Sequence, residues 1–479
     1  MESHGLRKKA LKALDDTKFY PDKGRERIKA MIETRPDWCV SRQRVWGVPL
    51  PIFVHKTTKE ILVDDNVNEN IASIYEKEGS DCWFSDNPQR FLGDKYKAED
   101  YEKISDIVEV WFDSGCTHAF VLEKREDLQW PASMYLEGSD QHRGWFHSSL
   151  LESCGTRGRA PYESILSHGF VVDGKGLKMS KSVGNVIAPE DILKKYGADI
   201  LRIWVASSNY AEDLRIDYSI LEQHADSYRK IRNTFRYLLG NLNDDFQKID
   251  KENLDIKQLP ELERYMLHRV YELNNNFKNY FKSYDFHNLY KELLNFCTVD
   301  LSSFYFDIRK DALYCDSKDS DRRKSSIVVL NIILESLVKW FAPILSFTTE
   351  EIFTLINKEQ KSIHLEQFMK YPETFQDEEL YEKWTELKKI RDICNISIEA
   401  KRASKEIGSS LEASLVINLN KTLFEISKNV DFSEICITSS ASVQQSNTDE
   451  TIIVTFKAEG NKCPVCWKIN KVKCERHSD

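Results

Sequence analysis

The chain has 479 residues, 41% of them hydrophobic and 30% charged, and its formal net charge is −9. That length allows roughly three domains, and a run of about 18 apolar residues, the mark of a membrane-spanning helix, does not occur. The start of the sequence has no apolar secretory segment, and most of the eleven cysteines are scattered. We therefore expect a cytoplasmic protein in a reducing compartment, with no membrane partner. The negative charge argues against nucleic-acid binding by bulk electrostatics, although a local basic surface would suffice.

The first third of the chain predicts alternating helices and strands. A helical pattern over residues 1–34 is interrupted between Phe19 and Gly24, and residues 36–54 alternate polar and apolar side chains as a strand does. Residues 55–105 are polar and carry little information. Strands are expected at Val108–Phe112, Ser133–Leu136 and Ile165–Val172, with a helix over Gly144–Cys154 before the last of them. This alternation indicates a parallel α/β sheet with functional residues at the strand ends.

A glycine-flanked basic segment at residues 176–185 follows the last of these strands. Asp173-Gly174 predicts a tight turn, and the glycines at 174, 176 and 184 give the segment backbone freedom. Lysine ammonium groups suit the charge that develops on a departing pyrophosphate. The plainer alternative is a solvated basic turn. The chemistry-bearing residues of the segment are Lys178, Met179, Ser180, Lys181 and Ser182.

The middle of the chain predicts helices. Pro189 opens one that Gly197 closes, and Ala198–Ser207 forms the next. From Tyr218 to about residue 357 the pattern is helical almost throughout, including a long core helix that stops near Pro343. We interpret residues 218–380 as an all-α bundle.

One basic helix in this bundle has arginines at matching positions. Arg229, Arg232 and Arg236 share a helical face, which indicates an RNA-binding surface or a solvated basic helix, and the spacing does not distinguish the two.

The last hundred residues predict a small α+β module and a tail. Residues 381–460 contain a charged helix from Trp384 to Lys405 and strands near 414–419 and 451–456. In the tail, residues 461–479, two closely spaced pairs supply three thiols and one imidazole, the donors of a tetrahedral zinc knuckle. The alternative is free thiols, but a segment this small needs metal for its folding energy. The four candidate ligands are Cys463, Cys466, Cys474 and His477. A site with four protein ligands is structural.

The ordered string Lys-Met-Ser-Lys-Ser at 178–182 resembles the second ATP motif of class I aminoacyl-tRNA synthetases. Residues 35–47, 110–115 and 135–146 resemble isoleucyl-tRNA synthetases at corresponding places and in the same order. The valyl, leucyl and methionyl enzymes share the lysine loop but differ over Ser139–Arg143. The resemblance covers nearly the whole chain.

The resemblance implies the activity and the roles of individual residues. Isoleucine would be activated by ATP with Mg²⁺ and transferred to tRNA(Ile) by a monomeric enzyme, with Lys178 and Lys181 catalytic. Residues expected to contact the aminoacyl-adenylate are Glu137, Gly138, Asp140 and Gln141. Related enzymes usually have a cysteine where His477 stands, and a longer spacer, so His477 departs from the pattern that the resemblance implies.

The resemblance also implies the organisation of the chain. Residues 1–35 would end an inserted editing domain, and residues 36–217 would be the second half of a Rossmann-like catalytic domain. Residues 218–380 would bind the anticodon. The His-x-Gly-His element of class I enzymes is not found in the sequence, so we expect a carboxy-terminal portion that is inactive alone. The alternative is a stand-alone tRNA-binding or regulatory paralogue without synthetase activity.

Overall fold

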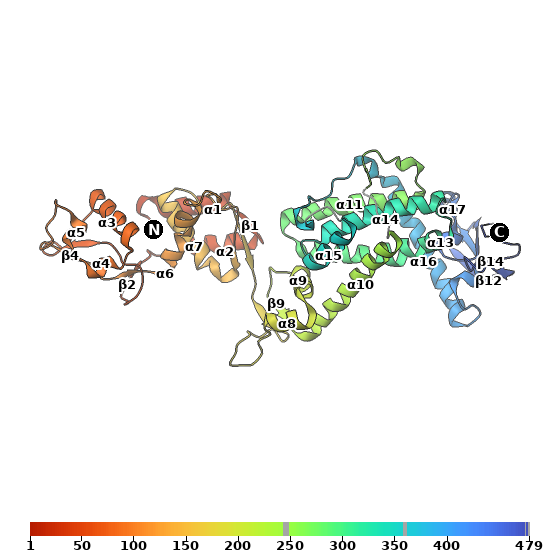
Figure 1. Cartoon of the computed structure of the whole chain (residues 1–479), viewed down its shortest axis with the longest axis horizontal. Helices are drawn as coiled ribbons and strands as arrows, with labels where there is room; N and C mark the ends of the chain where they lie inside the picture. Colours follow the sequence, from red (N-terminus) through yellow and green to blue (C-terminus); the bar gives the residue numbers. More distant parts are fainter. Residues whose placement is uncertain (243–248, 358–361, 475, 478–479) are drawn as a thin grey trace. The chain divides into compact units, whose positions relative to one another are not determined.

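The computed structural model describes residues 1–242, 249–357, 362–474 and 476–477 (Figure 1). The chain divides into two compact units. Unit 1 comprises residues 1–172 and 210–214, and unit 2 comprises residues 173–209 and 215–479. No helix in the described ranges has the length and apolar character needed to cross a membrane.

A three-stranded parallel sheet forms the centre of unit 1, in the order β1-β7-β6. Its strands are β1 (Lys18–Tyr20), β6 (Tyr135–Gly138) and β7 (Ser164–His168). Apolar side chains from three helices share a core with the sheet, and the predicted helix over Gly144–Cys154 is one of them. The helices are α1 (Leu6–Asp16), α2 (Lys23–Glu33) and α7 (Trp145–Thr156). The predicted break between Phe19 and Gly24 is present, and it contains β1, whose Phe19 lies opposite Ile165 in the sheet.

The expected strand at Val108–Phe112 is wrong over most of its length. Strand β5 covers only Ile107–Val108, and helix α6 runs from Val110 to Gly115. The Glu109 carboxylate accepts a hydrogen bond from the Trp111 backbone N–H at 3.1 Å, which caps this helix. Short pieces complete the region: β2 (Ser41–Arg42), β3 (Phe53–His55), β4 (Tyr101–Lys103), the π-helix η2 (His118–Leu122) and the 3₁₀-helices η1 (Ser3–Gly5) and η3 (Ser139–His142).

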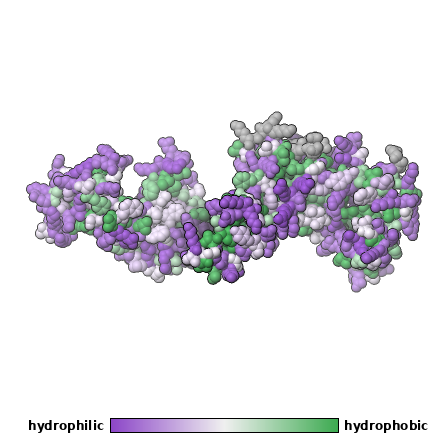
Figure 2. All heavy atoms as spheres, turned by 60° about the horizontal axis from the view of Figure 1, so that its bottom comes forward, coloured by the Kyte–Doolittle hydropathy of each residue, from purple (hydrophilic) through white to green (hydrophobic). Residues whose placement is uncertain are grey.

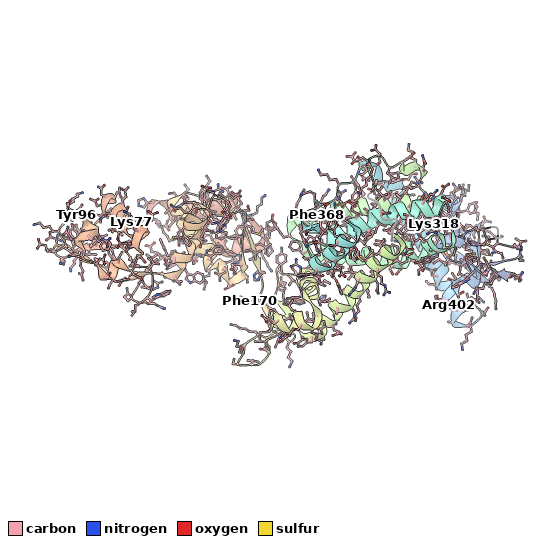
Figure 3. The ribbon with its side chains drawn as sticks, in the orientation of Figure 1. Lys77, Tyr96, Phe170, Lys318, Phe368 and Arg402 are labelled. Carbon is pink, nitrogen blue, oxygen red and sulfur yellow. The ribbon has the colours of Figure 1, made fainter. Side chains whose placement is uncertain are left out.

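Residues 55–105 have a small core of their own. Trp83 and Phe91 pack with Phe53 in a cluster that is almost fully buried. Lys77 and Tyr96 mark this part of the chain in Figure 3. Its helices are α3 (Asp65–Glu78), α4 (Cys82–Ser85) and α5 (Gln89–Leu92).

Unit 2 begins with the basic segment and two helices whose bounds agree with the prediction. Helix α8 (Pro189–Tyr196) has proline in its first turn and Gly197 at its end, and α9 covers Ala198–Ser207. Strands β8 (Val171–Asp173) and β9 (Leu214–Ile216) pair beside the segment.

A helical bundle follows, as predicted for residues 218–357, of which 243–248 lie outside the described residues. The long core helix α14 (Asp321–Phe341) ends two residues before Pro343, and Trp340 and Leu337 on it are fully buried. The other helices of this region are α10 (Tyr218–Leu242), α11 (Glu261–Ser283), α12 (Phe286–Asn295), the π-helical η6 (Phe296–Tyr305), α13 (Phe306–Cys315), α15 (Ser346–Ile356) and α16 (Glu378–Ala403). Single 3₁₀ turns are η5 (Ile256–Gln258), η7 (Ile363–Leu365), η8 (Glu373–Phe375) and η9 (Ser410–Glu412).

The carboxy-terminal module contains a mixed sheet in the order β11-β10-β12. Both expected strands are present, and a third, β11, was not predicted because its alternation is limited to two small apolar residues, Ala441 and Val443, in an otherwise polar sequence. Arg402 in Figure 3 marks the end of α16, which packs against this sheet. The elements are β10 (Ala413–Leu419), β11 (Ser440–Gln445), β12 (Ile452–Lys457), α17 (Lys421–Ser427), α18 (Phe432–Ile435) and the hairpin β13 (Asn461–Lys462) with β14 (Ile469–Asn470). Hydrophilic residues cover much of the face seen in Figure 2, with apolar residues in small groups between them.

Candidate active-site loop and metal centre

The basic segment is a loop closed by one aspartate and one asparagine. Asp173 accepts hydrogen bonds from the backbone N–H groups of Lys175 at 3.0 Å and Leu177 at 2.8 Å, and from the Asn185 amide at 2.9 Å. The Asn185 side chain also donates to the Lys178 carbonyl at 3.2 Å and accepts from the Ser180 N–H at 2.9 Å. The hydrogen bond from Asn185, followed by those from the backbone, lowers the pKa of Asp173 below its usual range. The two ends of the loop are therefore joined by Asp173, which the sequence analysis identified only as a turn residue, and by Asn185, to which it gave no role.

Lys178 and Lys181 are both exposed, and within the described residues neither forms an ion pair. The Ser180 and Ser182 hydroxyls lie 3.1 Å apart, and the Ser180 hydroxyl accepts a hydrogen bond from the Val183 N–H at 3.3 Å. The loop thus has a defined backbone and two ammonium groups that are available to an anionic ligand.

The glycines of this loop serve two different purposes. Gly176 and Gly184 have φ values of +81° and +72°, a conformation that disfavours residues with a Cβ. Gly174 has no positive φ; instead, a Cβ at this position would collide with the Asp217 carboxylate. The expected turn is present, but Gly174 is required there by a close approach.

The predicted adenylate-contacting residues lie at the carboxyl end of β6 and in η3. Glu137 is exposed, and Gly138 after it is buried. The Gln141 side chain accepts a hydrogen bond from the Trp145 backbone N–H at 2.9 Å and donates one to Asp140 at 2.9 Å. Gln141 therefore caps the start of α7 and holds Asp140 beside it.

Unit 1 contains buried polar residues, among them Glu152, which the sequence analysis did not single out. Glu152 on α7 is 8% exposed, and neither carboxyl oxygen has a regular hydrogen-bond partner among the described residues. Burial raises its pKa to about 8. His118 and His142 are also buried, and burial lowers the pKa of both imidazoles. A helical glutamate within a mixed sequence gives no signal of burial, so only the fold identifies this group.

The four predicted ligands in the tail come together. Their donor atoms all lie within 4.8 Å of one another. His477 Nδ1 is 3.5 Å from Cys463 Sγ and 3.4 Å from Cys474 Sγ, and the Sγ atoms of Cys466 and Cys474 are 3.8 Å apart. Tetrahedral zinc with Zn–S near 2.3 Å and Zn–N near 2.0 Å would separate its donors by about 3.8 Å (S to S) and about 3.5 Å (S to N). The donor set and its spacing therefore fit zinc.

Local backbone structure gives the two cysteines of the hairpin different thiol pKa values. The Cys463 N–H donates to the Lys468 carbonyl at 2.9 Å, and the Trp467 N–H donates to the Cys463 carbonyl at 3.0 Å. Backbone N–H groups of Cys466 and Val465 lower the pKa of the Cys463 thiol to about 6, whereas burial raises that of Cys466 to about 12. Cys463 is therefore prepared to act as a thiolate ligand.

Two family models match the chain. The one described as tRNA synthetases class I (I, L, M and V) matches residues 1–217, and the one described as the anticodon-binding domain of tRNA ligase matches residues 263–417. Residues 1–217 are thus similar to the class I tRNA synthetases, and residues 263–417 are similar to the anticodon-binding domain of tRNA ligases. The catalytic-like and anticodon-binding parts expected from the sequence are thereby confirmed.

Curated relatives narrow the similarity to isoleucine enzymes. The chain is 97% identical over all 479 residues to an isoleucine–tRNA ligase of Pelagibacter ubique, and it covers 53% of that protein. It is 48% identical over 475 residues to the isoleucine–tRNA ligase of Brucella abortus, with 97% of this chain and 48% of that protein covered. The chain spans about half the length of these relatives. The predicted resemblance to isoleucyl-tRNA synthetases is confirmed.

Solved synthetase structures share the fold. A leucyl-tRNA synthetase of Agrobacterium radiobacter in complex with tRNA superimposes with a TM-score of 0.53 at 16% identity, covering 82% of this chain and 46% of that one. A methionyl-tRNA synthetase of Mycobacterium tuberculosis with methionyl-adenylate gives 0.51 at 15% identity, covering 73% and 60%. At this identity the likeness is one of fold.

The predicted basic face lies on α10. Arg229, Arg232 and Arg236 are all exposed, while Ile231 and Phe235 on the same helix are buried in the bundle core. Arg229 pairs with Asp226, whereas Arg232 and Arg236 form no ion pair in the described part of the chain. The predicted shared face is present, and its RNA contact stays a prediction.

Proposed function

We propose that this chain supplies the lysine loop, the adenylate-contacting strand end, the anticodon-binding bundle and the metal knuckle of an isoleucine–tRNA ligase. The observation that carries the proposal is the loop closed by Asp173 and Asn185, which leaves Lys178 and Lys181 exposed and without an ion pair to any residue that the structure describes. The isoleucine relatives, which match along the entire chain, support the choice of amino acid.

In the first reaction a carboxylate oxygen of isoleucine attacks the α-phosphate of ATP, and pyrophosphate leaves. No general base is needed because the carboxylate is already ionised. Lys178 and Lys181 stabilise the negative charge that accumulates on the leaving group. Magnesium bound to the triphosphate would neutralise part of the same charge. The loop lysines therefore act on the transition state more than on bound ATP.

The second reaction transfers the isoleucyl group to a terminal ribose hydroxyl of tRNA(Ile). We assign contact with the isoleucyl-adenylate to Glu137, Gly138, Asp140 and Gln141 at the end of β6. The exposed carboxylate of Glu137 would accept hydrogen bonds from the ammonium group or the ribose hydroxyls.

RNA binding is assigned to the bundle. Arg229, Arg232 and Arg236 would contact phosphate groups, which position the tRNA without reading its bases. Met179, Ser180 and Ser182 complete the ATP loop. A cytoplasmic location and a monomeric state belong to the same proposal.

The knuckle would hold one structural zinc ion through Cys463, Cys466, Cys474 and His477. Four protein donors leave no open position for a substrate, so the ion would supply folding energy to a segment with little core.

Replacement of Lys181 tests the catalytic role. This chain is substituted for the matching part of the Pelagibacter ubique relative, and isoleucine-dependent ATP–pyrophosphate exchange is measured. Lys181→Ala should lower the exchange rate by about 100-fold or more, because a preorganised charge at the leaving group is lost. Lys175→Ala is the matched control, since Lys175 is an exposed lysine of the same loop outside the motif, and it should leave exchange nearly unchanged. Near-normal exchange in Lys181→Ala would refute the role.

A further inference from the structure

The two last described residues of the tail are tied to one helix end of the bundle. Arg476 donates to Asp311 at 2.7 Å and also bonds to Asp316, and His477 Nε2 donates to the Cys315 carbonyl at 2.9 Å. All three acceptors lie at the carboxyl end of α13 or directly after it. Because Nε2 carries the hydrogen, Nδ1 is the nitrogen left to face the Cys463 and Cys474 sulfurs.

These carboxylates are themselves fixed by a second arginine. Arg322 of α14 donates to Asp311 at 2.9 Å and to Asp316 at 2.8 Å. Burial alone would raise the pKa of Asp316, but its hydrogen bonds and charge interactions with Arg322 and Arg476 outweigh burial and hold that pKa below its usual range. Two arginines therefore balance two carboxylates, and Arg476 docks on acceptors that are already in place.

The ion pairs continue into the core of the bundle. Arg322 and Arg309 both donate to the same oxygen of Glu434, each at 2.7 Å. Arg309 also donates to Glu263 at 2.6 Å, and the Glu263 side chain has no exposed surface. A continuous series of charge-assisted hydrogen bonds thus runs from the buried centre of the bundle to the residue before His477.

We infer that the carboxyl end of α13 orients a ligand of the metal site, with Arg476, Asp311 and Asp316 as positioning residues for His477. The inference rests on the proposed zinc site. The ion pairs of Arg476 with Asp311 and Asp316, together with the hydrogen bond from His477 to the Cys315 carbonyl, position the tail so that the imidazole faces the three thiolates. Such outer partners typically change metal affinity by about 10- to 100-fold when removed.

A reciprocal effect follows from linkage. If the bundle strengthens metal binding through Arg476, the bound metal must stabilise the bundle by the same free energy. Metal binding at the tail would then change the stability of helices that lie far from it in the sequence.

The affinity of the full chain for Zn²⁺ tests the inference, measured by competition with a chromophoric chelator. Arg476→Met keeps the stem of the side chain and removes its donors, and it should weaken binding by about 10- to 100-fold. Lys471→Met is the matched control, because it breaks an exposed pair with Glu459 on the same knuckle, and it should change affinity less than twofold.

Two further measurements make every outcome decisive. The Co²⁺ spectrum of Arg476→Met should lose part of its histidine-dependent ligand-field pattern, and zinc should raise the thermal midpoint of the helical bundle more in the wild type than in this variant. Wild-type affinity in Arg476→Met, with an unchanged spectrum, would overturn the inference alone. If the wild-type chain takes up no zinc at all, the proposed metal site fails instead.

Discussion

Glu152 lies in an environment that its sequence context does not predict. It is a carboxyl group on α7 in unit 1, buried with no regular hydrogen-bond partner in the described ranges, and burial raises its pKa to about 8. In the unfolded chain the same group loses its proton near pH 4.3. Between these two values the folded protein keeps a proton that the unfolded chain has released.

The local stability of α7 should therefore fall as the pH rises from about 4.3 to about 8, by up to about 1.4 kcal/mol per pH unit. Glu152→Gln removes the titration and should flatten this dependence. Hydrogen exchange of the α7 amides at pH 5 and pH 8, corrected for intrinsic rates, measures the difference. Glu163→Gln, which alters an exposed carboxylate paired with Arg159, is the control. Equal pH dependence in wild type and Glu152→Gln would contradict the assignment.

At this scale, spacing predicted some residues and missed others. One Cys–Cys pair and one Cys–His pair indicate a metal site, because the ligands of a knuckle lie close together in the sequence. Asn185 and Arg476 gave no such signal, since their roles depend on partners that only the folded backbone brings near.

At the scale of elements, the lysine loop depends on its closing side chains. The Asn185 side chain donates hydrogen bonds to the Asp173 carboxylate and the Lys178 carbonyl, and it accepts one from the Ser180 N–H. Each such bond contributes about 1 kcal/mol.

Asn185→Ala should therefore speed amide exchange at Ser180 by about fivefold or more, because about 1 kcal/mol of local stability is lost. Site-resolved hydrogen exchange on the full chain checks this. Ser182→Ala in the same loop removes only a hydroxyl contact with Ser180 and should have a smaller effect. A loop that exchanges at the wild-type rate in Asn185→Ala would show that other contacts hold it.

The long helices were predictable and the short strands were not. The apolar period of α14 extends over many turns, so its end before Pro343 could be predicted from the sequence. Strand β1 has only three residues, and the two-residue β5 gives way to a helix capped by Glu109. Strands this short are specified by their neighbours in the sheet, and a local pattern contains little of that information.

At the scale of the whole molecule, buried charges connect the bundle with the carboxy-terminal module. Glu263 and Arg309 belong to the bundle and are almost fully buried, and Glu434 belongs to α18 of the module. Removing one partner of the buried Arg309–Glu263 pair should lower the free energy of unfolding, because the partner that remains keeps an uncompensated charge.

Arg309→Met should lower the unfolding free energy of the helical region by about 3–5 kcal/mol. The double variant Glu263→Gln/Arg309→Met should recover much of that loss, since no lone charge remains. Urea titration followed by helical circular dichroism measures both. A double variant as unstable as Arg309→Met would mean that packing around Arg309, and not its charge, explains the effect.

The position of the boundary between the first two regions is difficult to predict from the sequence. Contacts group the lysine loop, α8 and α9 with the helical unit, whereas the sequence places a boundary at residue 217. Motifs identify the family and the approximate regions, but they do not say where one compact body ends.

Gly174 affects how mutational scans of the lysine loop should be interpreted. A Cβ there would meet the Asp217 carboxylate, which would have to move to make room. Loss of activity in Gly174→Ala would therefore report a steric clash with Asp217, and it would not identify Gly174 as a nucleotide contact for inhibitor design.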